Sequence, residues 1–344
     1  MAKIKLVAIA KDEAAYLPEW IYHHLSIGVD AIDVYLNGIT DNSFKVMRRI
    51  CARHDNVNFF NADILMLNAV RAGRSFQYVV YRYAWQTERA NRNFSHLAFL
   101  DIDEFLVPEQ FGQNVDEIFV SSGKFDILSN LWYLDVPSDK GPFSQFFLES
   151  FKIQKTSVLK SVGRLRARLG FPMVHNFTKA NKELEKLNAV LSDGTKVQYT
   201  ALGKRISDAD IRRCVGKIEP WFVFHRVFRS HDEYCASLMR GRAHHRYDDP
   251  IKNNRFGYLP RVSMPHTIGP VYEYKISEER CLGYQQGYEN FIDECNLDVQ
   301  IEVGRQFVIQ RFDSLKELID ERPELVQRYK RVFRGTMFER QEIE

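Results

Sequence analysis

The chain has 344 residues, of which 45% are hydrophobic and 27% are charged. This composition is typical of a folded globular protein, and the length suits one large domain or two medium ones. The 48 lysines and arginines nearly balance the 45 acidic residues, which gives a net charge of +3. A dedicated nucleic-acid binder usually carries a concentrated basic excess, so we expect no nucleic-acid partner. The five cysteines form no C-x-x-C pair, which excludes the common zinc and redox motifs.

The apolar run near the N-terminus, Ile4–Ala10, is too short for a signal peptide or a membrane span. Elsewhere too, no segment reaches the ~18 apolar residues that a span requires. We therefore expect a cytoplasmic protein without a transmembrane anchor.

The first hundred residues predict strands that alternate with helices. Continuous apolar runs are typical of strands buried on both faces, and Pro18 and Gly28 bracket a helix in the expected order. The predicted strands are Ile4–Ala10, Ala31–Leu36, Val57–Phe60 and His96–Leu100, and further helices are capped by Asp41 and by Ser75. Such alternation favours parallel pairing in a doubly wound sheet. Ligands bind such sheets beyond the carboxyl ends of the strands.

The second half of the chain has a different pattern. From about residue 125 to residue 172, short apolar strands mix with turn residues and predict antiparallel additions to the sheet. Residues 178–218 are polar and irregular, as expected of a mobile insertion. From about residue 276 the pattern is helical, with helices predicted at Glu278–Cys295, at Phe307–Asp320 and after Pro323.

Two carboxylates follow the fourth predicted strand. Asp101 and Asp103 are separated by one residue, so in an extended chain their side chains point to the same side. Converging carboxylates repel unless a cation lies between them, and oxygen ligands favour Mg²⁺ or Mn²⁺. A second such pair, Asp208 and Asp210, has basic neighbours and is typical of a helix start. Only the first pair lies where a doubly wound sheet binds its ligands.

The residues around Asp101 also resemble a known family. The run Leu100–Leu106 is similar to the Asp-x-Asp-Glu-Phe signature of glycosyltransferases with the GT-A fold, in the family 2-like and family 92-like group. Other blocks of that group occur in the same order: Lys11-Asp12-Glu13, Glu19-Trp20, His23-His24 and Gly28-Val29, then Asn37 and Asp41, Gln77 with Tyr81, Lys160-Ser161 before His175, and finally Phe224-His225, Arg229-Ser230, Glu233-Tyr234 and Arg240-Gly241. The resemblance covers residues 4 to about 245.

The resemblance implies a GT-A-like α/β fold, with a doubly wound mixed sheet, helices on both faces and a helical C-terminal extension. The expected domain is residues 1–270, divided into a nucleotide-binding half (1–108) and an acceptor half (109–270), and residues 271–344 form the helical region. The implied activity is metal-dependent, inverting transfer of a sugar from a nucleotide-sugar, most often a UDP-sugar, to a hydroxyl of a glycan or lipid-linked acceptor in surface polysaccharide biosynthesis.

Three sets of candidate site residues follow. The metal is assigned to Asp101 and Asp103, completed by either His225 or His175. Inversion requires a general base, normally a carboxylate, and the candidates after the metal motif are Asp135, Asp139 and Glu149. The donor contacts are assigned to Glu13, Asn37, Asp63, Gln77, Asp101 and Lys160, and Glu104 is expected to support the metal.

The C-terminal stretch from Arg328 to Arg340 is basic, with apolar residues interleaved. It suits either peripheral contact with an anionic membrane or docking on the domain or on a second subunit in a homodimer.

Two other functions are compatible with parts of the sequence. Leu36 and Arg226 depart from the family pattern, which would suit a non-catalytic sugar- or protein-binding module on a degenerate transferase fold. A nucleotidyltransferase also uses a doubly wound sheet and paired carboxylates. It usually has a glycine-rich loop after the first strand, and none follows Ala10 here.

Overall fold

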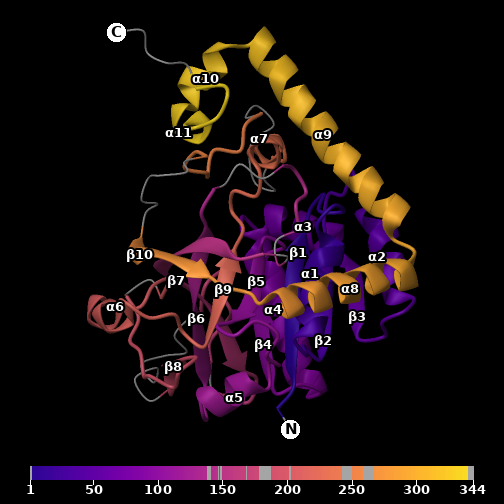
Figure 1. The fold of residues 1–344 in the computed structure, drawn as a ribbon. Helices are drawn as coiled ribbons and strands as arrows, with labels where there is room; N and C mark the ends of the chain where they lie inside the picture. Colours follow the sequence, from indigo (N-terminus) through magenta and orange to yellow (C-terminus); the bar gives the residue numbers. More distant parts are fainter. Residues whose placement is uncertain are drawn as a thin grey trace.

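The computed structural model describes residues 2–137, 141–145, 147, 149–167, 169–177, 187–200, 203–241, 250–258 and 266–339. Within these residues ten strands form one mixed sheet (Figure 1). The first part is parallel, in the order β3-β2-β1-β4, with β1 at Ile4–Ala10, β2 at Ala31–Leu36, β3 at Val57–Asn61 and β4 at His96–Phe99. The predicted alternation of parallel strands and crossover helices is confirmed.

The second part of the sheet is mainly antiparallel. The 14-residue strand β7 (Phe151–Arg164) pairs with β4 near its end and with β10 (Thr267–Tyr274) near its start. Beyond β7 the order continues β6-β9-β5, and β8 pairs with β6. The bounds are β5 Glu104–Pro108, β6 Ile127–Asp135, β8 Ala189–Leu191 and β9 Trp221–His225. The predicted antiparallel extension is therefore also confirmed.

Helices cover both faces of the sheet. Side chains along β1 point alternately to opposite sides, so neighbouring residues of β1 pack against different helices. Leu6 and Ala8 pack in a core with α1 (Leu17–Ser26), α2 (Ser43–Cys51) and α8 (Glu278–Cys295). Val7 packs in a second core, together with α3 (Asp63–Arg71) and α4 (Phe76–Asn91). The remaining helices are α5 Glu117–Ser121, α6 Asp208–Cys214, α7 His231–Leu238, α9 Asp298–Glu321, α10 Glu324–Arg328 and α11 Lys330–Phe333. The predicted mixed α/β class, with helices on both faces, is confirmed.

The C-terminal helices are also confirmed, although α9 begins at Asp298 rather than at Phe307. Figure 1 shows α9 as a long helix that leads from the end of α8 to α10 and α11. Ile301 of α9 belongs to the first core, whereas Phe312 and Leu315 belong to a third core with α7, α10 and α11. The helix α9 therefore joins the sheet to the C-terminal end of the molecule.

Two predicted regions differ in detail from expectation. Between residues 178 and 218, the described part carries the strand β8, which pairs with β6, and the helix α6. Ser207 is the N-cap of α6, and its side chain accepts a hydrogen bond from the backbone N of Asp210. Residues 178–186 lie outside the described residues. In the basic C-terminal stretch, Val332 and Phe333 are buried in the third core. In the described part of the chain, no helix is long and apolar enough to cross a membrane. The division at residue 270 stays a prediction.

Candidate functional site

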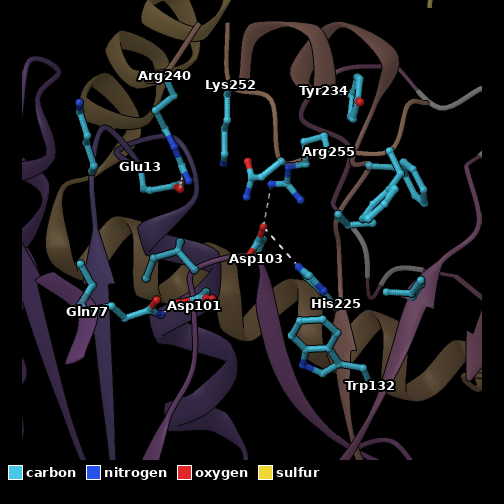
Figure 2. Close-up of a pocket in the computed structure, with 18 of the residues that line it drawn as sticks. Glu13, Gln77, Asp101, Asp103, Trp132, His225, Tyr234, Arg240, Lys252 and Arg255 are labelled. Atoms are coloured by element: carbon cyan, nitrogen blue, oxygen red, sulfur yellow. Dashed lines mark hydrogen bonds and ion pairs between the residues drawn. The ribbon is translucent and has the colours of Figure 1, made fainter. Parts of the chain in front are cut away.

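A cavity of about 800 Å³ opens at the carboxyl ends of the parallel strands. The first wall, on the side of the parallel strands, is formed by the loops after β1, β2 and β4 and by the start of α4. The second wall lies opposite and is formed by β6, β7, β9, α7 and residues 252–257. Figure 2 shows acidic residues of the first wall facing basic residues of the second. The lining residues used below are Lys11, Glu13, Asn37, Gln77, Asp101, Asp103, Trp132, His225, Tyr234, Arg240, Lys252 and Arg255. The cavity therefore lies where the fold predicts a ligand site.

Asp101 occupies the turn between β4 and β5, and both of its carboxylate oxygens have partners. Its Oδ1 accepts hydrogen bonds from Gln77 Nε2 and from the Tyr81 hydroxyl, each at 3.4 Å. Its Oδ2 lies 3.4 Å from Lys160 Nζ. The carboxylate is thus held in a fixed orientation at the edge of the cavity.

Beneath Asp101, Lys160 makes a buried ion pair with Glu104. Its Nζ lies 3.0 Å from Glu104 Oε2, and both side chains are buried. Burial raises the pKa of Glu104 to about 7, although the nearby Lys160 opposes this rise. Glu104 Oε2 also accepts a hydrogen bond from the backbone N of Asp101 at 2.9 Å. Lys160 is not a lining residue, so the structure places it as a support for the Asp101 turn.

Asp103 faces the cavity and is surrounded by cations. Its Oδ2 lies 3.5 Å from His225 Nε2 and 3.3 Å from Arg255 Nη2 (Figure 2). Burial alone would raise the pKa of Asp103, but His225, Arg255 and Arg229 hold it well below its ordinary value. Burial alone would lower the pKa of His225, but the interaction with Asp103 outweighs burial, so the pKa of His225 is raised. Asp103 is therefore ionised at neutral pH.

These residues can be tested against the divalent cation that the sequence implies. In the part of the chain that the structure describes, no group of three His, Cys, Asp or Glu side chains converges as a metal cage. Asp103 Oδ2 and His225 Nε2 nevertheless face each other beside the cavity. Mg²⁺ usually keeps waters and takes one or two carboxylates together with substrate phosphates. The donor set therefore fits a cation shared with a bound phosphate ligand.

The other histidine candidate, His175, does not line this cavity. Its Nδ1 lies 3.2 Å from the carbonyl oxygen of Leu159, and burial lowers its pKa to about 4, assisted by Lys160. The Trp132 ring contacts both histidines, with centroids 5.0 Å from His175 and 4.4 Å from His225. The structure thus brings His225, and not His175, to Asp103.

The three candidate bases have different positions. Asp135 is buried and accepts hydrogen bonds from the backbone N of Phe228 at 3.3 Å and of Arg229 at 3.0 Å. It fixes the bend after β9 and does not line the cavity. Glu149 is exposed and is also absent from the lining. Asp139 lies outside the described residues.

The donor candidates from the first three strands also differ. Glu13 lines the cavity and pairs with Arg240 and, at 3.4 Å, with Arg229. Asn37 lines it too. Asp63 does not; its Oδ1 accepts a hydrogen bond from the backbone N of Gly38 at 2.7 Å and so shapes the turn after β2.

Several lining residues were missed by the sequence analysis, above all Arg255, Lys252 and Trp132. Arg240 belongs to a block of the resemblance, but Arg255 follows two asparagines in a segment without periodicity. Lys252 and Arg255 reach the cavity because residues 252–257 fold over it (Figure 2). No local pattern in the sequence predicts that position.

No family model matches the chain, and no curated protein matches it in sequence. Similar solved structures include HddC from Yersinia pseudotuberculosis, at 10% identity and a TM-score of 0.29, over 55% of this chain and 90% of that one. They also include the mannosyltransferase Ktr4p from S. cerevisiae, at 9% identity and a TM-score of 0.25, over 40% of each chain. A cytidylyltransferase from Leptospira borgpetersenii has 11% identity and a TM-score of 0.28, over 56% of this chain and 76% of that one. Neighbours this distant assign no function to this chain.

Proposed function

We propose that the protein is a metal-dependent glycosyltransferase that binds a nucleotide-sugar, most simply a UDP-sugar, in this cavity. One observation supports it above the others: Asp101 and Asp103, at the end of β4, share the cavity with the cations Arg240, Lys252 and Arg255. A diphosphate needs such positive groups, and carboxylates at this position suit a bridging cation.

In this proposal both walls contribute to the cation site. Asp103 and His225 would hold the cation, and Gln77, Tyr81 and Lys160 fix Asp101 beside it. When bound, a divalent cation neutralises charge on the leaving diphosphate. The arginines add charge-assisted hydrogen bonds to phosphate oxygens.

Inverting transfer further requires a base beside the acceptor hydroxyl. Among the described lining residues, the acids are Glu13, Asp101 and Asp103, and Glu13 is already paired with two arginines. Asp135 and Glu149 do not line the cavity, so Asp139, which lies outside the described residues, stays the candidate for the base. The acceptor class, a glycan or lipid-linked hydroxyl in surface polysaccharide biosynthesis, is part of the same proposal.

The first test is calorimetric titration of UDP, with GDP and CDP as comparators, in the presence and absence of Mn²⁺. We expect metal-dependent UDP binding that Asp103→Ala weakens by about 10- to 100-fold or more, as is typical when a metal-supporting group is lost. Asp208→Ala is the matched control, because it removes an exposed carboxylate from the second Asp-x-Asp pair.

Metal-dependent binding that is lost only in Asp103→Ala would support the donor site and lead to a screen of UDP-sugars for turnover. If no nucleotide binds with metal present, or if Asp103→Ala binds normally, the metal site is wrong. A binding module without turnover would then be the better account of the fold.

A further inference from the structure

The helix α3 presents apolar side chains to solvent on its outer face. Ile64, Leu67 and Val70 are 73%, 53% and 53% exposed. They lie three residues apart, so they share one side of the helix. Ala69, on the opposite side, is buried in the second core. A folded protein rarely leaves a contiguous apolar surface uncovered without a partner.

Neighbouring elements extend this surface. Phe60, at the end of β3, and Tyr83, on α4, are also exposed. Both rings contact Tyr35, with centroids 5.0 Å and 6.4 Å apart, and α3 packs against α4. We call Phe60, Ile64, Leu67, Val70 and Tyr83 the outer apolar face.

In the segment that carries the outer apolar face, the fully exposed charges are all positive. Every residue from 57 to 93 is described, and its five arginines, at positions 71, 74, 82, 89 and 92, are exposed. The two acids of this segment are engaged elsewhere: Asp63 accepts from Gly38, and Glu88 is buried against Lys5. The chain as a whole is nearly balanced, with a net charge of +3. This segment is therefore a local concentration of exposed positive charge.

The inner side of α3 lies close to the cavity. Asn37, a lining residue, has its Nδ2 3.6 Å from Met66 Sδ of α3. Ser75 and Gln77, which follow α3, also line the cavity. A surface that covered the outer apolar face would therefore lie next to the cavity wall.

We propose that the outer apolar face docks on an anionic lipid bilayer, with its apolar side chains in the interface and its arginines at the headgroups. Exposed apolar residues on a helix, together with exposed arginines and no fully exposed acid in the same segment, are the combination that binds anionic interfaces. Such docking would place the cavity beside the membrane, where a lipid-linked acceptor is found. The docking does not depend on the sugar transfer proposed above.

The test is co-sedimentation of the full chain with vesicles, without nucleotide or metal. Vesicles of phosphatidylcholine are compared with vesicles that also contain phosphatidylglycerol. We expect binding to the anionic vesicles alone, lowered at least tenfold by Ile64→Ser with Leu67→Ser, since burial of each side chain is lost. Arg71→Gln with Arg74→Gln should lower binding about fivefold for each arginine removed.

The matched control is Val299→Ser with Val303→Ser, which removes two exposed apolar residues, 66% and 46% exposed, from one side of α9. This control should bind vesicles as the unmodified protein does. The proposal is overturned if the unmodified protein does not bind anionic vesicles, or if the α3 variant binds as well as the α9 control. UDP titration of the same variants tests the donor site separately, so failure of either proposal can be recognised without the other.

Discussion

The guanidinium of Arg255 lies against the carboxylate of Asp103, with Nη2 3.3 Å from Oδ2. His225 Nε2 lies 3.5 Å from the same oxygen. In the proposed site a divalent cation needs this oxygen, so it must compete with a positive charge that the protein itself supplies. The cation should therefore bind weakly until a phosphate ligand draws the arginine away.

The first prediction removes this competitor. Arg255→Ala should bind Mn²⁺, without nucleotide, about tenfold more tightly than the unmodified protein, because a hydrogen bond between charged groups contributes ~1.5–3 kcal/mol. UDP binding should weaken in the same variant, because in the proposed site Arg255 also contacts a phosphate of the ligand. Titration with MnCl₂ alone and then with UDP separates the two effects. Equal Mn²⁺ affinity with and without Arg255 would show that the cation does not use Asp103.

The second prediction concerns the buried support under Asp101. Lys160→Met leaves Glu104 buried without its cation, and breaking a buried ion pair usually costs ~3–5 kcal/mol. Urea unfolding should show this loss of stability. The matched control is Lys217→Met, whose partner Asp193 lies at 2.6 Å on the surface, and which should cost no more than about 1 kcal/mol. A similar cost for both variants would contradict a special role for Lys160.

Much of the fold could be predicted from the sequence, because the parallel strands are continuous apolar runs. The strands β1 and β2 have the predicted bounds, and so does α8. The helix α3 was missed. Apolar residues occupy exposed positions of α3, at Ile64, Leu67 and Val70, as well as its buried side, so the sequence shows no clear helical period of apolar residues.

The site was predictable only in part. The position of Asp101 and Asp103 follows from strand ends, since the sheet brings these ends to one edge. The residues that face them come from distant segments: His225 ends β9, and Arg255 lies in an irregular loop. Such a position depends on tertiary packing, and no local spacing in the sequence encodes it. For the same reason the sequence could not show that Asp135, a candidate base, accepts hydrogen bonds from the backbone of Phe228 and Arg229.

The third prediction is a pH dependence of stability at Asp135. Burial raises its pKa from 3.8 to about 6, so the folded state binds a proton more readily than the unfolded chain. This group therefore contributes stability that is fully present below pH 3.8 and is lost as the pH rises through about 6.

Measured by urea unfolding, the stability of the unmodified protein relative to Asp135→Asn should rise as the pH falls from 7 to 4. The full change is ~3 kcal/mol at 1.36 kcal/mol per pKa unit. Asp208→Asn, at an exposed acid of α6, controls for loss of one negative charge. A difference that is flat with pH would mean that folding does not shift this carboxyl.

The fourth prediction concerns the contact between α9 and the loop after β1. Asp12 of this loop has a φ of 52° and receives Arg311 of α9 at 2.8 Å. The same carboxylate accepts a hydrogen bond from the backbone N of Thr40 at 2.6 Å. The helix α9 thus fixes the loops that carry Lys11, Glu13 and Asn37 to the cavity, and moving α9 should disturb ligand binding.

Gly304→Ala tests this contact. A Cβ at Gly304 would lie 2.7 Å from the backbone N of Ala15 and 3.0 Å from the backbone C of Ala14, so α9 must shift. We expect a loss of ~1–3 kcal/mol in the free energy of unfolding and weaker UDP binding. Gly283→Ala in α8 is the matched control: nothing lies within 4 Å of its Cβ, and alanine should stabilise this helix by ~0.5–1 kcal/mol. If the two variants are equally stable and bind UDP equally, α9 does not position the β1 loop.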